Sequence, residues 1–259
     1  MEKLVNINLK DIFLGENMIK KLKAIYLREQ FNPKFIGLFI NPFYFARKGL
    51  YKNVSELIVN LNGKLLDVGC GTKPYQNLCK VDEYIGLEID NEGNRQHQYA
   101  DVFYDGKTIP FDDKYFDSIL LTQVFEHVFN PDEFLKEINR VTKMGGVLLM
   151  SVPFVWDEHE QPYDYARYSS FGLKHILSKN GFEIIEHRKS NNGLEAIFQL
   201  INGYIFKVTF TKSGYVNLLT TLLLMAPINI IGLLISSILP KNDDLYLDNI
   251  VLAKKVKDV

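Results

Sequence analysis

The stretch LLDVGCGTKPY, residues 65–75, joins an apolar run to two closely spaced glycines. The run KLLDV (64–68) predicts a buried strand that carries Asp67 near its end, and Gly69 and Gly71 then let the backbone turn and approach a ligand closely. Loops that bind dinucleotides follow the pattern GxGxxG, and here Pro74 takes the place of the third glycine. Their ligand is a phosphate, which Asp67 would repel. The turn therefore predicts a nucleotide-like ligand without phosphate.

Short apolar strands alternate with helices along the rest of the chain. A helix stripe indicates a helix over 131–141, and a second helix is expected to end before Gly181, because glycine commonly stops helices in a left-handed conformation. This alternation predicts an α/β fold with a doubly wound, seven-stranded, mostly parallel sheet, and a ligand at the carboxyl ends of its strands. The strands are expected at 64–68, 84–89, 98–102, 116–123, 146–153, 182–188 and 247–255.

Two acids follow the glycine turn at the spacing of an adenosine site. Glu88 ends the second strand, where a carboxylate accepts hydrogen bonds from a ribose diol. Asp101 is expected after the third strand, placed to accept from the amine of an adenine. Together with Asp67 they favour S-adenosylmethionine, which has a ribose, an adenine and a cationic amino-acid tail. The expected cofactor-binding residues are Asp67, Gly69, Cys70, Gly71, Glu88, Ile89, Asp101, Val102 and Gln123.

Plainer interpretations exist for the same residues. The glycines could mark an ordinary strand-to-helix turn, and Glu88 could be a solvated acid at a strand end. Asp101 could cap a loop, and Gln123 could have no contact with a ligand. Cys70 is expected to be a small packing residue, because no neighbouring base is evident that would activate its thiol.

The order of these motifs resembles the S-adenosylmethionine-dependent methyltransferases with a Rossmann-like sheet, and most closely the type-11 methyltransferase family. LLDVGCGTKPY resembles the first motif of that family, IGLEID its ribose-binding strand end and YADV its adenine contact. FDSILLTQVFEHV and EINRVTKMGG resemble its fourth strand and the turn before its fifth. The resemblance covers about 64–188, with a last strand at 247–255, and implies methyl transfer. Lys73 departs from the family pattern, which has a third glycine there.

Two segments offer a base for methyl transfer to a hydroxyl. FEHVFNP places His127 just after the fourth strand, and the long loop after the fifth strand contains His159. A neutral imidazole can accept a proton near neutral pH, so both histidines are candidate catalytic residues. His127 could instead only brace its loop. No metal site is expected, since Glu158, His159 and Glu160 are adjacent in sequence and adjacent residues rarely point to one ion.

The loop after the fifth strand is long, aromatic and polar, which is typical of a lid over an acceptor. Its segment HEQPYDYARY resembles methyltransferases associated with cell-surface glycan assembly. The residues expected to bind the acceptor are Asp164, Tyr165, Arg167 and Tyr168.

The composition indicates which cellular compartment and which classes of partner to expect. The chain has 30 Lys and Arg against 31 Asp and Glu, and this near-neutral balance gives no electrostatic case for a nucleic-acid partner. The only cysteines are Cys70 and Cys79, and they are not expected to form a disulfide framework. The segment MEKLVNINLKDIF has no apolar run typical of a signal peptide, so a cytoplasmic protein is expected.

Three parts are expected along the chain: an N-terminal helical cap (1–63), a methyltransferase domain (64–190 with 246–259) and a hydrophobic helical insert (191–245). Residues 213–240 carry no charge and are numerous enough to span a bilayer. Pro227 is expected to break them into two short helices. We therefore expect peripheral contact of 213–240 with the inner face of the cytoplasmic membrane. Burial against the N-terminal helices and a full span are the alternatives.

The leading function is methyl transfer from S-adenosylmethionine to an oxygen of a sugar or glycan, either as a small molecule or as a lipid-linked intermediate. A methyltransferase of quinones or other lipids is the second hypothesis. The third is a non-catalytic, membrane-associated protein with the same fold.

Overall fold

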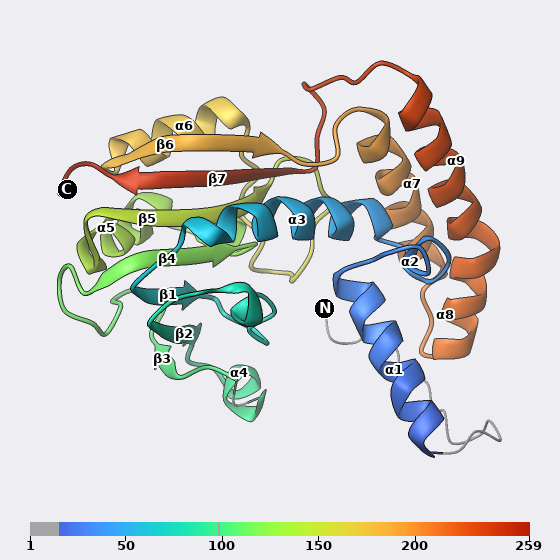
Figure 1. Ribbon diagram of the computed structural model, residues 1–259, viewed down its shortest axis with the longest axis horizontal. Coiled ribbons are helices and arrows are strands. Elements are labelled where there is room, and N and C mark those ends of the chain that lie inside the picture. The colour runs from blue at the N-terminus through green and yellow to red at the C-terminus, as the bar shows by residue number, and fades with distance from the viewer. Residues whose placement is uncertain (1–15, 98) are drawn as a thin grey trace. The chain divides into compact units, whose positions relative to one another are not determined.

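The computed structural model describes residues 16–97 and 99–259 (Figure 1). The described residues form two compact units. A sheet unit contains 52–190 and 248–259, and a helical unit contains 191–247 together with the described residues up to Tyr51. The first 15 residues of the predicted helical cap lie outside the described part of the chain.

Seven strands form one sheet in the order β3-β2-β1-β4-β5-β7-β6. Only β7 is antiparallel to its neighbours, β5 and β6. The predicted doubly wound, mostly parallel α/β sheet is therefore confirmed, and its strand order reverses between β1 and β4, where ligands of such sheets bind. The strands are β1 (Lys64–Val68), β2 (Glu83–Ile89), β3 (Val102–Tyr104), β4 (Phe116–Thr122), β5 (Thr142–Pro153), β6 (Phe182–Lys189) and β7 (Asp248–Lys255).

Short helices connect these strands: α4 (Glu92–His97), α5 (Pro131–Val141) and α6 (Ser170–Lys179). The apolar stripe of α5 is buried, as its spacing predicts. Ser169 caps α6 by accepting a hydrogen bond from the Gly172 amide, and the helix ends before Gly181, which has the left-handed conformation expected of a stop.

The third strand lies further along the chain than predicted. β3 begins at Val102, so the predicted strand over 98–102 is wrong, and Gln98 lies outside the described residues. The aromatic run VFY has a stronger strand preference than the polar residues before it. Asp101 therefore precedes β3, and Asp105 is the acid that follows it.

The helical unit contains α1 (Glu16–Phe31), α2 (Gly37–Ile40) and the start of α3 (Tyr44–Leu57). The insert between β6 and β7 adds α7 (Leu194–Thr209), α8 (Gly214–Thr220), a π-helical segment (Thr221–Met225) and α9 (Ala226–Ile238).

Residues 214–238 form one continuous helix of 25 residues, so the predicted break at Pro227 is wrong. The π-helical segment ends just before Pro227, and its wider hydrogen-bond spacing removes the bond that a proline cannot make. By length and composition this helix could cross a membrane, and 28% of its most apolar window is buried within the protein.

Candidate active site

The glycine turn after β1 packs directly on the segment after β4. Gly69 has φ +67°, and a Cβ there would lie 2.4 Å from Val124 Cγ2. Gly71 has φ +47°, and a Cβ there would meet no atom of the described residues within 4 Å. Lys73, which replaces the third glycine of the family pattern, has φ +53° and so keeps a left-handed backbone. The turn thus has one packed glycine and one that faces open space.

Glu88 faces this turn from the end of β2. Its Oε2 accepts a hydrogen bond from the Gly71 amide at 3.1 Å, and its Oε1 accepts from the Ile89 amide at 3.1 Å. Ile89 is exposed beside it. The predicted ribose-binding acid therefore lies at the carboxyl ends of β1 and β2.

Asp67 and Cys70 lie below the turn and are buried. Asp67 is 3% exposed and accepts a hydrogen bond from the Tyr84 hydroxyl. Burial raises the pKa of Asp67 from 3.8 to about 7, and the Glu88 charge adds to this rise. Burial, with the nearby acids, raises the pKa of the Cys70 thiol to about 12. Cys70 is therefore a packing residue and not a nucleophile.

Asp101 does not lie at the carboxyl end of a strand, because it precedes β3. Its Oδ2 accepts from the Gly86 amide at 2.7 Å and from Lys73 Nζ at 2.5 Å. Its neighbour Val102 is half-buried within β3 and pairs with Leu87.

Asp105 takes the place at the carboxyl end of β3 that was expected for Asp101. Its Oδ1 accepts hydrogen bonds from the amides of Lys107 and Thr108 at 2.8 and 2.9 Å. Burial raises the pKa of Tyr104 to about 12, and the charges of Glu88 and Asp105 add to this rise, so both acids lie near that ring. In the sequence, Asp105 can be recognised as the acid directly after VFY. The strand predicted over 98–102 points to Asp101 instead.

Gln123 follows β4 with φ +55°. Its Nε2 donates to Ser151 Oγ at 3.2 Å and to Asp248 Oδ1 at 3.3 Å. Its side chain thus ties the ends of β4, β5 and β7 together.

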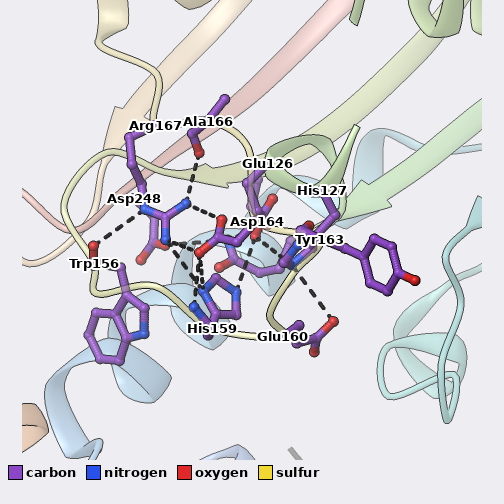
Figure 2. A network of polar contacts seen from close by, with 12 residues as sticks. Glu126, His127, Trp156, His159, Glu160, Tyr163, Asp164, Ala166, Arg167 and Asp248 are labelled. Atoms are coloured by element: carbon purple, nitrogen blue, oxygen red, sulfur yellow. Dashed lines mark hydrogen bonds and ion pairs between the residues drawn. The ribbon is translucent and has the colours of Figure 1, made fainter. Parts of the chain in front are cut away.

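Both candidate bases meet beside a glutamate that sequence reasoning missed (Figure 2). The ring centroids of His127 and His159 lie 4.8 Å apart, and the rings meet edge to face. Glu126 Oε1 lies 3.9 Å from His127 Nε2 and 4.0 Å from His159 Nε2. The segment Phe125–His127 comes directly after β4, and His159 comes from the loop between β5 and α6. We call Glu126, His127 and His159 the EHH cluster.

Glu126 is an unusual member of this cluster because it is fully buried. No other residue in the described part of the chain donates a hydrogen bond to either of its carboxylate oxygens. Burial raises its pKa to about 8, and the charges of Asp248 and Asp164 raise it further, against the opposing charge of Arg167. The adjacent letters EH after a predicted strand were the available signal, but they do not reveal burial.

An ion pair between Arg167 and Asp164 holds the loop that carries His159. The guanidinium binds both carboxylate oxygens, at 2.6 and 2.7 Å, and keeps the pKa of Asp164 far below its usual value. Arg167 also donates to the carbonyl of Asp157 at 2.9 Å, and Asp164 Oδ2 accepts from the His159 amide at 2.9 Å. These two residues, expected to bind an acceptor, position the loop in this structure.

The two tyrosines of the loop lie differently. Tyr165 is 44% exposed, and its amide donates to the Glu126 carbonyl at 2.9 Å. Tyr168 is half-buried and stacks on Phe125 with ring centroids 4.9 Å apart. The loop is thus anchored directly on the segment that carries the EHH cluster.

Comparisons with known proteins agree with this architecture. Residues 66–150 match the family model described as "Methyltransferase domain". An uncharacterized protein of Methanocaldococcus jannaschii is 31% identical over 143 residues, which cover 52% of this chain and 61% of that protein. A fatty-acid O-methyltransferase of Mycolicibacterium smegmatis is 30% identical over 168 residues, or 58% of this chain and 59% of that enzyme. The chain thus spans about three fifths of the length of these two relatives.

A solved structure shares the fold. The crystal structure of a SAM-dependent methyltransferase from Archaeoglobus fulgidus aligns with a TM-score of 0.50 at 20% identity, over 90% of this chain and 99% of that one. The matched family model covers β1 to β5, including the glycine turn and Glu88. Residues 66–150 are therefore similar to a methyltransferase domain, and the chain has the fold of the class I S-adenosylmethionine-dependent methyltransferases.

Proposed function

We propose that the protein transfers a methyl group from S-adenosylmethionine to a hydroxyl oxygen of a sugar or glycan, either free or linked to a lipid. The observation that carries this proposal is the nearness of the glycine turn to the EHH cluster. Val124 packs on Gly69 and lies two residues before Glu126. The cofactor turn and a proton-accepting cluster thus share one edge of the sheet.

The residues around the turn fit the cofactor. Gly71 leaves open space beside the backbone, and Glu88 lies where it would accept hydrogen bonds from the ribose diol. Asp67, buried below the turn, favours a cationic amino-acid tail over a phosphate. Asp105 at the end of β3 lies where it would accept from the adenine amine.

The chemistry that the bound cofactor supplies is a methyl group on a sulfonium sulfur. The acceptor oxygen forms a bond to the methyl carbon while the carbon–sulfur bond breaks and its electron pair goes to sulfur. Holding the acceptor in line with that bond can contribute up to roughly 7–11 kcal/mol. The hydroxyl proton must leave, and the EHH cluster presents imidazole nitrogens that can accept it.

The sequence favours a sugar or glycan acceptor, whereas one relative favours the lipid alternative. The segment HEQPYDYARY resembles methyltransferases of glycan assembly, and one relative acts on fatty acids. Transfer of a labelled methyl group to extracts, followed by partition between water and organic solvent, separates the hypotheses. A water-soluble product supports a free sugar acceptor. A solvent-soluble product that releases a methylated sugar on mild acid supports a lipid-linked glycan, and one without sugar supports a quinone or other lipid. No transfer would support the non-catalytic hypothesis.

Calorimetry with S-adenosylhomocysteine tests the cofactor site. We expect Glu88→Ala to weaken binding by roughly 1.5–3 kcal/mol, because hydrogen bonds to a charged acceptor are lost. Glu83→Ala at the opposite end of β2 is the matched control and should bind like the wild type. Equal affinity of Glu88→Ala and wild type would refute the ribose assignment, and preference for NAD would refute the cofactor.

We further propose that this cytoplasmic protein attaches peripherally to the inner face of the cytoplasmic membrane through its helical unit. The helix Gly214–Ile238 buries polar residues and exposes large apolar ones, the reverse of what is expected for a protein in water. Its buried residues include Asn217, Thr221 and Asn229, whereas its exposed side consists of large apolar residues. Those exposed residues include Leu219, Leu222, Leu223, Leu224, Ile231, Leu234 and Ile238.

The polar side chains pair inside the helical unit, which leaves the apolar ones outward. Asn202 on α7 donates to Asn229 Oδ1 at 2.8 Å. Asn229 in turn donates to the carbonyls of Leu38 and Asn41 at 3.0 and 3.1 Å. This arrangement is typical of helices that face lipid, where buried polar groups join helices and apolar groups meet acyl chains.

The topology favours attachment from one side. The insert leaves the sheet after β6 and returns to β7, and these strands are paired neighbours. It must therefore begin and end on the same side of a membrane. Lys20, Lys21 and Lys23 are exposed on α1 of the same unit, and such basic residues favour anionic lipid head groups.

Co-sedimentation with anionic liposomes tests this attachment. We expect the intact protein to pellet with the vesicles, and Leu223→Asp and Leu234→Asp to reduce the bound fraction, because a charge must then enter the lipid boundary. Phe171→Asp, at an exposed apolar residue of the sheet unit, is the control and should pellet like the wild type. An intact protein that stays in the supernatant at moderate salt would refute the proposal.

A further inference from the structure

We propose that the EHH cluster binds a divalent transition-metal ion, such as Zn²⁺, Co²⁺ or Mn²⁺, at the carboxyl end of β4. Each residue offers one ligand atom, and these atoms all lie within 4.8 Å of one another. Two imidazole nitrogens and one carboxylate oxygen form a ligand set that suits such ions. The expectation of no metal site considered only Glu158, His159 and Glu160, whereas the fold brings together a different set.

Glu126 provides the strongest support for this site. It is fully buried, and among residues 16–97 and 99–259 no other residue donates a hydrogen bond to its carboxylate. Burying an unpaired carboxylate is strongly unfavourable, so natural proteins pair such groups or use them to coordinate metals. The acids Asp248 and Asp164 add repulsion to it. A cation between Glu126 and the two histidines would satisfy the carboxylate.

The hydrogen bonds of His127 fix which of its nitrogens is available. Its Nδ1 lies 2.6 Å from the carbonyl oxygen of Tyr163 (Figure 2). A carbonyl oxygen can only accept, so Nδ1 is the donor, and in the neutral ring the lone pair is on Nε2. That Nε2 faces Glu126 Oε1.

His159 has the same arrangement. Its Nδ1 lies 3.2 Å from Asp164 Oδ2 and 3.4 Å from the carbonyl of Asp157, and both oxygens accept. Arg167 Nη2 lies 3.4 Å from this nitrogen, but it donates to Asp164 at 2.7 Å. The lone pair is therefore on Nε2, which also faces Glu126. Metal-binding histidines are typically oriented in this way, by a carboxylate or carbonyl on the other ring nitrogen.

The cluster is slightly wider than a loaded site. Tetrahedral zinc, with bonds of about 2.0–2.1 Å, separates its ligand atoms by roughly 3.3 Å. The gaps of 3.9 and 4.0 Å around Glu126 Oε1, and of up to 4.8 Å between the ligand atoms overall, would have to narrow by roughly 0.6 to 1.5 Å through side-chain movements. Glu160 Oε2 lies 3.8 Å from His127 Nε2 on an exposed side chain. Three protein ligands with a replaceable fourth are typical of catalytic ions.

The role of the ion rests on the proposed function, although its binding does not. An ion held here would bind the acceptor hydroxyl and lower its pKa, so that the proton leaves to water. The oxygen's electron pair then forms the bond to the methyl carbon, and the pair of the carbon–sulfur bond goes to sulfur. In this arrangement His127 and His159 are ligands rather than bases.

Titration of chelator-treated full-length protein with Co²⁺ tests the site, since bound Co²⁺ has visible absorption bands that report its ligands. We expect one ion per chain, and at least a tenfold loss of affinity in Glu126→Gln and in His159→Ala. His175→Ala, on the exposed side of α6, is the control and should bind like the wild type. Thermal unfolding checks each variant, and Zn²⁺ should raise the Tm of the wild type but not that of Glu126→Gln.

The outcomes separate this inference from the proposed function. Wild type that binds S-adenosylhomocysteine but neither Co²⁺ nor Zn²⁺ would overturn the metal site alone. Stoichiometric metal binding that survives in folded Glu126→Gln and His159→Ala would place the ion elsewhere and also overturn it. Metal binding as predicted, without binding of S-adenosylhomocysteine, would refute the proposed function and leave the metal site standing.

Discussion

Asp67 is an acid held where water does not reach, and its titration should be visible in the stability of the protein. Its pKa is about 7 in the folded chain and near 3.8 in an unfolded one. Between these values the folded state binds more protons, so Asp67 contributes stability at low pH that is lost as the pH rises through 7. A shift of about three units corresponds to at most roughly 4 kcal/mol.

The matched measurement is urea unfolding of wild type and Asp67→Asn between pH 4 and 8. Asparagine keeps an oxygen that can accept from Tyr84 but does not titrate. We expect the free energy of unfolding of wild type to fall relative to that of the variant as the pH rises from 4 to 7. Other titrating groups cancel in this difference. Parallel curves would mean that Asp67 titrates normally.

Asp105 and Asp101 can be told apart by the part of the cofactor they contact. If Asp105 accepts from the adenine amine, wild type should bind S-adenosylhomocysteine more tightly than its inosine analogue, in which a carbonyl replaces the amine. Asp105→Ala should lose most of this preference, about tenfold, because the acceptor of the amine is gone. Asp101→Asn should retain it, since Asp101 binds Lys73 and Gly86. Calorimetry with both ligands gives the ratio of the two affinities for each variant. Loss of the preference in Asp101→Asn but not in Asp105→Ala would assign the adenine contact to Asp101 instead.

The sequence locates individual residues well where local pattern and position agree. The acid–glycine turn and Glu88 lie where predicted, because both follow strands with clear apolar runs. Glu126 could not be identified as special, since its burial depends on the loop after β5, which folds back over it by bonds such as that from the Tyr165 amide. Long-range packing of this kind leaves no signal in the local sequence.

At the scale of elements, the turn after β1 contains two glycines with different reasons to be there. Gly69→Ala would place a methyl group 2.4 Å from Val124 Cγ2, on a left-handed backbone. Gly71→Ala would meet open space and incur only the backbone strain, about 1 kcal/mol. We expect Gly69→Ala to lower stability by about 2–3 kcal/mol and Gly71→Ala by about 1 kcal/mol.

Gly71→Ala should be the more stable of these two variants but should still lose cofactor affinity. A methyl group at Gly71 enters the space that the cofactor would occupy, so Gly71→Ala should bind S-adenosylhomocysteine at least tenfold more weakly while remaining folded. Denaturant unfolding and calorimetry measure the two effects separately. A Gly71→Ala variant that binds normally would show that the cofactor does not approach this glycine.

Two elements show where pattern reasoning fails. The third strand was placed too early because β3 has only three residues, Val102–Tyr104, too few to give a clear alternation. The sequence predicts a break at Pro227, but the helix Gly214–Ile238 continues past it, with a π-helical segment just before the proline. Such adjustment depends on hydrogen bonds over a whole turn and cannot be derived from the proline alone.

At the scale of the whole molecule, the two units differ in the apolar surface that they expose. In the sheet unit the strands bury apolar residues, as proteins in water do. The helical unit also buries apolar residues, among them Leu38, Tyr44 and Phe45. It buries the amides of Gln199, Asn202 and Asn229 as well, and many of its leucines are exposed. Apolar content alone could not distinguish these arrangements in the sequence, because only the fold shows which side of each helix faces inward.

The contrast between buried amides and exposed leucines predicts that two truncations on one helix affect stability and membrane affinity in opposite order. Asn229→Ala removes the donor to the carbonyls of Leu38 and Asn41 and leaves the Asn202 amide with only its longer bond to the Met225 carbonyl, at 3.3 Å. We expect the free energy of unfolding of the helical unit to fall by about 2–4 kcal/mol, because buried polar groups lose their hydrogen bonds. Leu234→Ala, at an exposed position of α9, should change that stability by at most about 0.5 kcal/mol.

Membrane affinity should reverse the order of these two variants. Leu234→Ala removes apolar surface that would contact lipid, so its partition into anionic vesicles should weaken severalfold, whereas Asn229→Ala, measured at a temperature where it stays folded, should partition like the wild type. Thermal unfolding in mild detergent and vesicle co-sedimentation give the two quantities on the same preparations. A strong loss of stability in Leu234→Ala, or equal partition of both variants, would mean that the exposed leucines are covered by protein rather than by lipid.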